Sequence, residues 1–254
     1  MFSLFLRCAP DEEDLVSAEL WEQDTAGIAD EPGGLRAFFE DEKRVPEMLQ
    51  RFARWSPEVR VESDTDWAQV SRDAWPPLLV GERFFLVPPW RDDPVPPGRL
   101  RLEINPGMAC GTGQHPATQL CLEAMERYVC PGGTVLDVGS GSGILSAAAR
   151  LLGAWQVIAC DIDHDAVEIA RRRVEVPFFT GSIDAVRSGS ADVIVANINS
   201  ETIERLRDEF ERVRRASAST LILSGFPEWD VVEGFALTET LRRGEWVCCV
   251  SSLP

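Results

Sequence analysis

The sequence predicts an α/β protein with two unequal parts. The larger part is a mostly parallel seven-stranded sheet, with helices on both faces and an antiparallel hairpin at its end. Three observations predict this architecture. Apolar, β-branched runs alternate with helical patterns from residue 99 onward, as in a parallel sheet that is covered on both faces. A hairpin pattern ends the chain, and a separate set of short apolar runs occupies the first 65 residues.

The first part, residues 1–65, is expected to fold as a small ferredoxin-like α/β domain. Apolar residues recur on one side of its first helical pattern. The expected elements, in chain order, are a strand Phe2–Arg7, a helix Glu12–Gln23, a strand Leu35–Phe39, a helix Val45–Trp55 and a strand Val59–Glu62. Residues 1–60 hold 14 acidic and seven basic residues, which favours a basic partner and a role in substrate recognition.

Residues 66–98 are expected to form a proline-rich linker. A helix can run from Asp66 to Trp75, and seven prolines follow it. Proline cannot donate to a sheet ladder, so regular pairing is disfavoured, although Leu78–Val87 could form an edge ribbon. A linker stiffened by proline sets the spacing of two domains.

Residues 99–254 contain the elements of the parallel sheet. The expected strands are Thr134–Gly139, Gln156–Asp161, Pro177–Gly181, Asp192–Ile198 and Thr220–Ser224. Helices are expected near 114–129, 142–152, 163–174 and 200–215. The closing hairpin would pair Phe235–Leu241 with Trp246–Ser251 through the turn Arg242–Glu245.

The composition narrows the class of protein. A formal net charge of -17 argues against a nucleic-acid footprint, which needs a basic face. No apolar stretch is long enough to span a bilayer, so we expect no membrane partner. The seven cysteines form no C-x-x-C pair, which favours a reduced, cytoplasmic protein without a metal site. We expect a monomer.

The segment Asp137–Gly143 has the pattern of a ligand-binding turn. Its pattern, D-x-G-x-G-x-G, places Gly139, Gly141 and Gly143 in a turn between a buried strand and a helix. Glycine permits close approach of a ligand, and the helix start offers backbone N–H groups. Dinucleotide enzymes use G-x-G-x-x-G instead, so a nucleotide-binding oxidoreductase is the less favoured interpretation. The spacing resembles that of S-adenosylmethionine-dependent class I methyltransferases, whose sheet also ends in a hairpin.

Two further side chains stand at the ends of predicted strands, where ligands bind in such sheets. Asp161 can accept hydrogen bonds from ribose hydroxyls, although it could instead cap the next helix, a role that Asp163 fills equally well. Asn197 can contact cofactor or substrate, although it could simply form a turn. Ile162, next to Asp161, is expected at the cofactor as well.

Four segments resemble the bacterial ribosomal protein L11 methyltransferases. Asn105–Thr118 is similar to the family's "DPGLAFGTGTHPTT" loop, and Val135–Leu145 to its "VLDVGCGSGIL". Asp192–Ile198 is similar to "DVVVANI", and Gly244–Trp246 to the closing "EW" hairpin. The resemblance covers residues 66 to 250, approximately, and the loop is its specific motif.

The resemblance implies transfer of methyl groups from S-adenosylmethionine to lysine ε-amines and an N-terminal α-amine of that basic ribosomal protein. It places Thr118, Gly139, Gly141, Gly143, Asp161, Ile162 and Asn197 at the cofactor, and Asn197, Thr112 and His115 at the reaction. His115 could accept a proton or simply start a helix ahead of Pro116.

The sequence departs from the family pattern at several positions: Cys110, Gln114, Ala117 and Asn199 replace the family's usual residues, and the segment 173–177 is short. These departures leave an alternative in which the same chemistry acts on another protein or a small molecule. A non-catalytic binding protein with the same fold is a further alternative.

Overall fold

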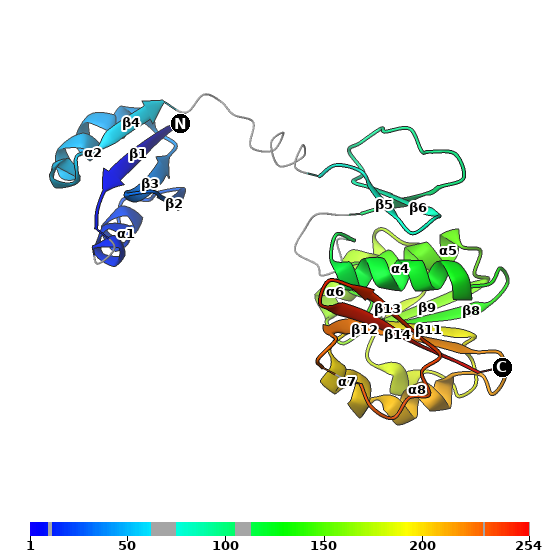
Figure 1. Ribbon diagram of the computed structural model, residues 1–254. Coiled ribbons are helices and arrows are strands. Elements are labelled where there is room, and N and C mark those ends of the chain that lie inside the picture. The colour runs from blue at the N-terminus through cyan, green and yellow to red at the C-terminus, as the bar shows by residue number, and fades with distance from the viewer. Residues whose placement is uncertain (10–11, 62–74, 105–112, 231, 254) are drawn as a thin grey trace. The chain divides into compact units, whose positions relative to one another are not determined.

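The computed structural model describes residues 1–9, 12–61, 75–104, 113–230 and 232–253 (Figure 1). The chain divides into two compact units, Met1–Ala74 and Trp75–Pro254. Residues 75–98, which we expected to belong to the linker, therefore pack with the second unit. The expected helix over Asp66–Trp75 lies almost entirely outside the described residues.

The first unit has the expected ferredoxin-like topology. Its elements are β1 (Phe2–Arg7), α1 (Glu13–Trp21), β2 (Gly27–Glu31), β3 (Gly34–Phe39), α2 (Val45–Arg51) and β4 (Glu58–Val61), with short 3-10 turns at Glu42–Arg44 and Ala53–Trp55. The strands form an antiparallel sheet in the order β2-β3-β1-β4. Alternate residues of β1 and β3, such as Leu4 and Ala37, are fully buried with Leu20 of α1 and Met48 of α2.

One strand of this unit was absent from the sequence-based prediction. β2 reads Gly-Ile-Ala-Asp-Glu and lies at the sheet edge, where none of its residues is fully buried. An edge strand with one solvated face needs no apolar run, so its sequence carries no strand signal.

The second unit contains the seven-stranded sheet, in the order β10-β9-β8-β11-β12-β14-β13. Its strands are β8 (Thr134–Val138), β9 (Gln156–Asp161), β10 (Phe178–Thr180), β11 (Val193–Asn197), β12 (Thr220–Pro227), β13 (Glu239–Arg243) and β14 (Trp246–Ser252). Strands β8 to β12 are parallel, and β14 and β13 are antiparallel to their neighbours. The class I methyltransferase fold that we predicted is confirmed, with a hairpin that starts four residues later than expected.

Helices cover both faces of this sheet (Figure 1). One layer contains α4 (Pro116–Tyr128), α5 (Ile144–Leu151) and α6 (His164–Arg171), and the other contains α7 (Ser200–Arg205) and α8 (Arg207–Val213). The helix expected over 200–215 is therefore two helices, which meet at Leu206. A 3-10 turn, Ile183–Ala185, follows β10.

A three-stranded sheet precedes α4. It consists of β5 (Leu78–Val80), β6 (Phe84–Val87) and β7 (Leu100–Glu103), with β5 antiparallel and β7 parallel to β6. The edge ribbon expected at Leu78–Val87 is present, and β7 extends it. β7 was not predicted from the sequence. It pairs in parallel with a segment 16 residues earlier (Phe84 with Leu100), and a parallel pair has no connecting hairpin turn that a sequence pattern could indicate.

No helix in the described part of the chain combines the length and the apolar character that crossing a bilayer requires.

Candidate functional site

The glycine turn lies at the carboxyl edge of the large sheet, where β8 ends. The N–H groups of Gly139 and Ser140 both donate to the carbonyl oxygen of Cys160, at 2.9 and 3.0 Å. This attaches the turn to the neighbouring strand β9. Gly139, Gly141 and Gly143 have φ angles of 74°, 50° and 81°, a region that disfavours residues with a Cβ atom. The turn therefore needs glycine at all three predicted positions.

Asp161 joins the end of β9 to this turn. One carboxylate oxygen accepts the N–H of Gly141 at 2.8 Å, and the other accepts the N–H of Asp163 at 3.0 Å. The alternative role as helix cap belongs to Asp163, whose side chain accepts the N–H of Asp165 at 2.9 Å at the start of α6. Asp161 thus holds a half-buried negative charge against the turn, with lone pairs left for further donors.

Asp137, at the end of β8, carries a second carboxyl group at this edge. The side chain is fully buried, and burial raises its pKa to about 6, against the lowering effect of a hydrogen bond from Ser146. The Ser146 hydroxyl donates to Oδ2 at 2.6 Å. Within the described residues, Asp137 Oδ1 and the buried hydroxyl of Ser140 have no hydrogen-bond partner. Buried polar atoms without partners are uncommon, and these two make the turn suited to a polar ligand.

Thr118 and Asn197 meet across the sheet edge, although 79 residues separate them. The Asn197 side-chain amide donates to the Thr118 hydroxyl at 3.0 Å. Thr118 is buried in the first turn of α4, and Asn197 is half-buried at the end of β11. This bond fixes the orientation of the amide and leaves the Asn197 carbonyl oxygen as an acceptor at the site.

His115 has a structural position at the start of α4. Its Nδ1 atom accepts the N–H of Ala117 at 3.3 Å, which caps the helix, and Pro116 follows at the first helical position. Its ring lies edge-on to that of Trp246, with centroids 4.3 Å apart. Because Nδ1 already accepts a backbone hydrogen bond, only Nε2 is left for other partners. Thr112, the other loop residue predicted to take part in the reaction, lies outside the described residues.

Two isoleucines follow the predicted polar residues. Ile162, directly after Asp161, is 80% exposed and presents an apolar surface beside the carboxylate. Ile198, directly after Asn197, packs between two glycines: a Cβ on Gly139 would lie 2.3 Å from its side chain, and a Cβ on Gly225 would lie 2.5 Å from its carbonyl oxygen. Ile198 therefore fixes the spacing between the glycine turn and β12.

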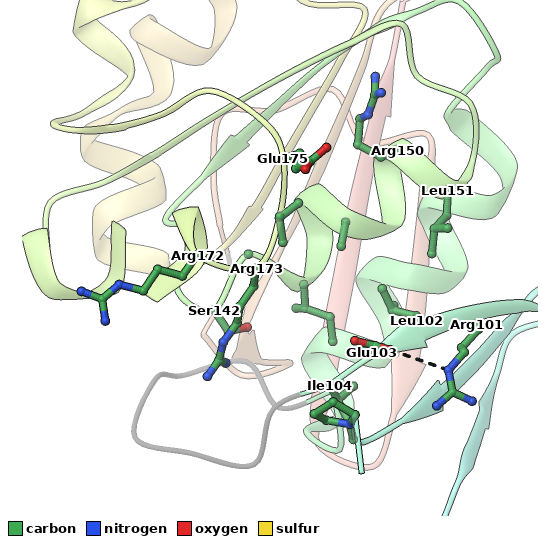
Figure 2. Close-up of a pocket in the computed structure, with 15 residues that line it drawn as sticks. Arg101, Leu102, Glu103, Ile104, Ser142, Arg150, Leu151, Arg172, Arg173 and Glu175 are labelled. Carbon is green, nitrogen blue, oxygen red and sulfur yellow. Dashed lines mark ion pairs between the residues drawn. The ribbon is translucent and has the colours of Figure 1, made fainter. Parts of the chain in front are cut away.

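A cavity of about 600 Å³ adjoins the glycine turn on the side of α5 (Figure 2). Its lining residues include Ser142 and Gly143 of the turn, together with Arg101, Glu103 and Arg150. Asp161, Thr118 and Asn197 are not among its lining residues. The cavity is thus a neighbour of the predicted site and does not contain its polar groups.

The structure also shows residues that sequence reasoning missed. Ser146 donates to Asp137 in β8, and Ile198 lies against Gly139; the only sequence signal for both was their position after a recognised motif. Asn199, a departure from the family pattern, caps α7: its side chain accepts the N–H of Thr202 at 2.8 Å.

Several known proteins with similar sequences, and one solved structure, carry the name of a single family. Residues 10–253 match the family model described as ribosomal protein L11 methyltransferase (PrmA). The ribosomal protein L11 methyltransferase of Geobacter sulfurreducens is 43% identical over 208 residues, which cover 77% of this chain and 69% of that protein. The one of Pelotomaculum thermopropionicum is 35% identical over 248 residues, which cover 89% and 80%. The crystal structure of ribosomal protein L11 methylase from Lactobacillus delbrueckii subsp. bulgaricus gives a TM-score of 0.62 at 29% identity, covering 70% of this chain and 99% of that one.

Proposed function

This chain belongs to the ribosomal protein L11 methyltransferase family, and we propose that it methylates lysine ε-amines and the N-terminal α-amine of ribosomal protein L11. It is a methyltransferase that uses S-adenosylmethionine. The comparisons do not favour the alternative of another acceptor. That alternative drew on Asn199, whose capping of α7 gives the residue a structural reason.

One observation supports the cofactor site above the others: the carboxylate of Asp161 binds the glycine turn directly. We propose that its remaining lone pairs accept the ribose hydroxyls of S-adenosylmethionine and that Ile162 packs against the adenine. Gly139, Gly141 and Gly143 would let the cofactor approach the backbone of the turn. Asp137 and Ser140 offer buried polar atoms that suit the cofactor's ammonium and carboxylate groups.

Thr118 and Asn197 are proposed to stand at the methyl group. The sulfonium supplies an activated methyl, so the protein has to bind, align and desolvate the reactants. Near neutral pH, a lysine with a pKa of about 10.4 is uncharged in roughly one molecule in a thousand, a cost of about 4 kcal/mol. The Asn197 carbonyl oxygen, held by the bond to Thr118, can accept a hydrogen bond from the uncharged amine and direct its lone pair. We propose that solvent takes the proton, because the Nδ1 atom of His115 accepts the N–H of Ala117 and the hydrogen of the neutral ring is then on Nε2.

The remaining proposals concern the rest of the chain. We propose that residues 1–65 bind the basic substrate protein through their acidic surface, and that the part of the expected linker ahead of Trp75 connects this domain to the catalytic one. We also propose that the protein acts as a monomer in the cytoplasm and binds no nucleic acid directly. The acidic charge supports the last of these proposals.

The proposed acceptor can be tested with labelled cofactor. The purified protein is incubated with methyl-labelled S-adenosylmethionine and either ribosomal protein L11 or a whole ribosomal extract, and labelled peptides are identified by mass spectrometry. We expect label on amino groups of ribosomal protein L11 in both reactions, and much less label with the variant Asp161→Ala at the same cofactor concentration. Label on a different protein, with ribosomal protein L11 unlabelled, would contradict the proposal.

A further inference from the structure

The segment that follows β12 forms a tight turn at the carboxyl edge of the sheet. The Asp230 N–H donates to the Pro227 carbonyl oxygen at 3.0 Å and closes the turn. The Glu228 N–H donates to the carbonyl oxygen of Glu245, in the turn of the closing hairpin, at 2.8 Å. The turn is thus attached at its start to the hairpin and cannot pivot freely.

A side-chain bond also attaches this turn to the methyl-transfer edge. The hydroxyl of Ser200 donates to the carboxylate of Asp230. Ser200 is the first residue of α7 and follows Asn197 by only three positions, and α7 packs against β12 (Figure 1). The pairing of β11 with β12 also places the turn near Asn197. Asn197 pairs with Ser224, and the turn begins three residues after Ser224.

Trp229 is presented to solvent by this turn. Its side chain is 68% exposed, and it is not a member of the hydrophobic clusters of the described residues. Single exposed apolar residues are ordinary. Here, however, the indole is held on an anchored turn and is followed directly by a carboxylate, so the two groups together can bind a ligand. Asp230 keeps further acceptor capacity, since a carboxylate has about four lone-pair sites and Ser200 uses one of them.

A lysine side chain fits this pair of groups. A lysine side chain has an ammonium group on a stem of four methylene groups. The face of an indole ring attracts the ammonium, and the apolar area of the ring packs against the stem. A carboxylate adds a charge-assisted hydrogen bond. Resting on the proposed function, we infer that Trp229 and Asp230 bind the acceptor lysine of the substrate as it enters the methyl-transfer site.

The surroundings of the turn favour a cationic occupant. Glu228 lies within the turn, and Glu233 and Glu204 lie close to it, joined by a hydrogen bond from the Glu233 N–H to the Glu204 carboxylate at 3.2 Å. Arg242 contacts Glu228 at 3.5 Å, and the guanidinium of Arg207 lies beside Gly234, so two cations offset part of the charge of Glu204, Glu228, Asp230 and Glu233. A basic acceptor protein therefore meets a surface of the opposite charge.

Steady-state kinetics with ribosomal protein L11 as acceptor test this inference. For Trp229→Ala and for Asp230→Asn we expect the KM for the acceptor to rise about tenfold, the size of one cation–π or charged contact. The kcat and the Kd for S-adenosylmethionine, measured by calorimetry, should change less than twofold. Trp229→Phe keeps an aromatic face and should recover most of the acceptor affinity.

Trp155→Ala is the matched control. Trp155 is 79% exposed and directly precedes β9, at the amino edge of the sheet, opposite the site. This variant should leave every constant unchanged. An acceptor KM within twofold of the wild-type value in both Trp229→Ala and Asp230→Asn overturns the inference while the proposed function stands. A wild-type protein that neither binds nor methylates ribosomal protein L11 overturns the proposed function and this inference with it.

Discussion

The buried carboxyl group of Asp137 gives the stability of the protein a specific pH dependence. An exposed aspartate has a pKa of 3.8, and burial raises the pKa of Asp137 to about 6. The difference corresponds to about 3 kcal/mol, since one pKa unit is about 1.4 kcal/mol. Between these two values the folded protein keeps a proton that the unfolded chain releases. Stability therefore falls as the pH rises from about 4 to 6, and this contribution is constant above about pH 7.

The variant Asp137→Asn removes this titration. The sequence pI is near 4.5, so the useful range starts at pH 5, where solubility is better. Between pH 5 and pH 7 the wild-type protein should lose roughly 1.4 kcal/mol of stability relative to the variant, about half of the full effect. The amide introduces a buried N–H₂ group with its own cost, but that cost does not depend on pH. Urea denaturation followed by far-UV circular dichroism at several pH values measures the difference.

A second variant checks the same reasoning. Ser146→Ala removes the hydrogen bond that lowers the pKa of Asp137, so the loss of stability should move to higher pH. Parallel curves of unfolding free energy against pH for the wild-type protein and Asp137→Asn would refute the assignment of a raised pKa to this residue.

Three further predictions follow from the site and its supports. Asp161→Ala should weaken S-adenosylmethionine binding about 100-fold or more, the loss of two charged hydrogen bonds at 1.5 to 3 kcal/mol each; unchanged calorimetric binding would refute the ribose assignment. His115→Gln should lower stability by about 1 kcal/mol through the lost helix cap and leave the dependence of rate on pH unchanged, whereas a shifted pH profile would make His115 a base. Gly225→Ala should lower stability by about 2 kcal/mol or more, because its φ is 101° and a Cβ would meet the backbone of Ile198; a melting temperature equal to that of the wild-type protein would contradict this.

The sequence predicts those parts of the molecule whose causes are local. Buried parallel strands are apolar on both faces, so β8, β9, β11 and β12 are visible as runs of residues. The glycine turn is visible because three positive φ angles require three glycines. The polar edge strand β2 and the parallel partner β7 leave no such pattern, and both were missed.

The features of the candidate site also fall into those that the sequence predicts and those that it does not. Asp161 and Asn197 could each be placed at the end of a strand from the sequence, but their partners could not. The bond between Thr118 and Asn197 and the bond between Ser200 and Asp230 join segments 79 and 30 residues apart. Sequence periodicity describes one element at a time, so contacts of this kind appear only when the elements are assembled.

The position of Ile198 between Gly139 and Gly225 has a consequence for how acceptor choice can change. One side chain and its backbone hold the cofactor turn on one side and the end of β12 on the other. The connection from β12 to β13 begins beyond this support with the exposed residues Glu228, Trp229 and Asp230, whereas Val232 and Phe235 pack in the core. Exchange of residues 228–230 between relatives is therefore expected to change the affinity for the acceptor and to leave the affinity for the methyl donor unaltered.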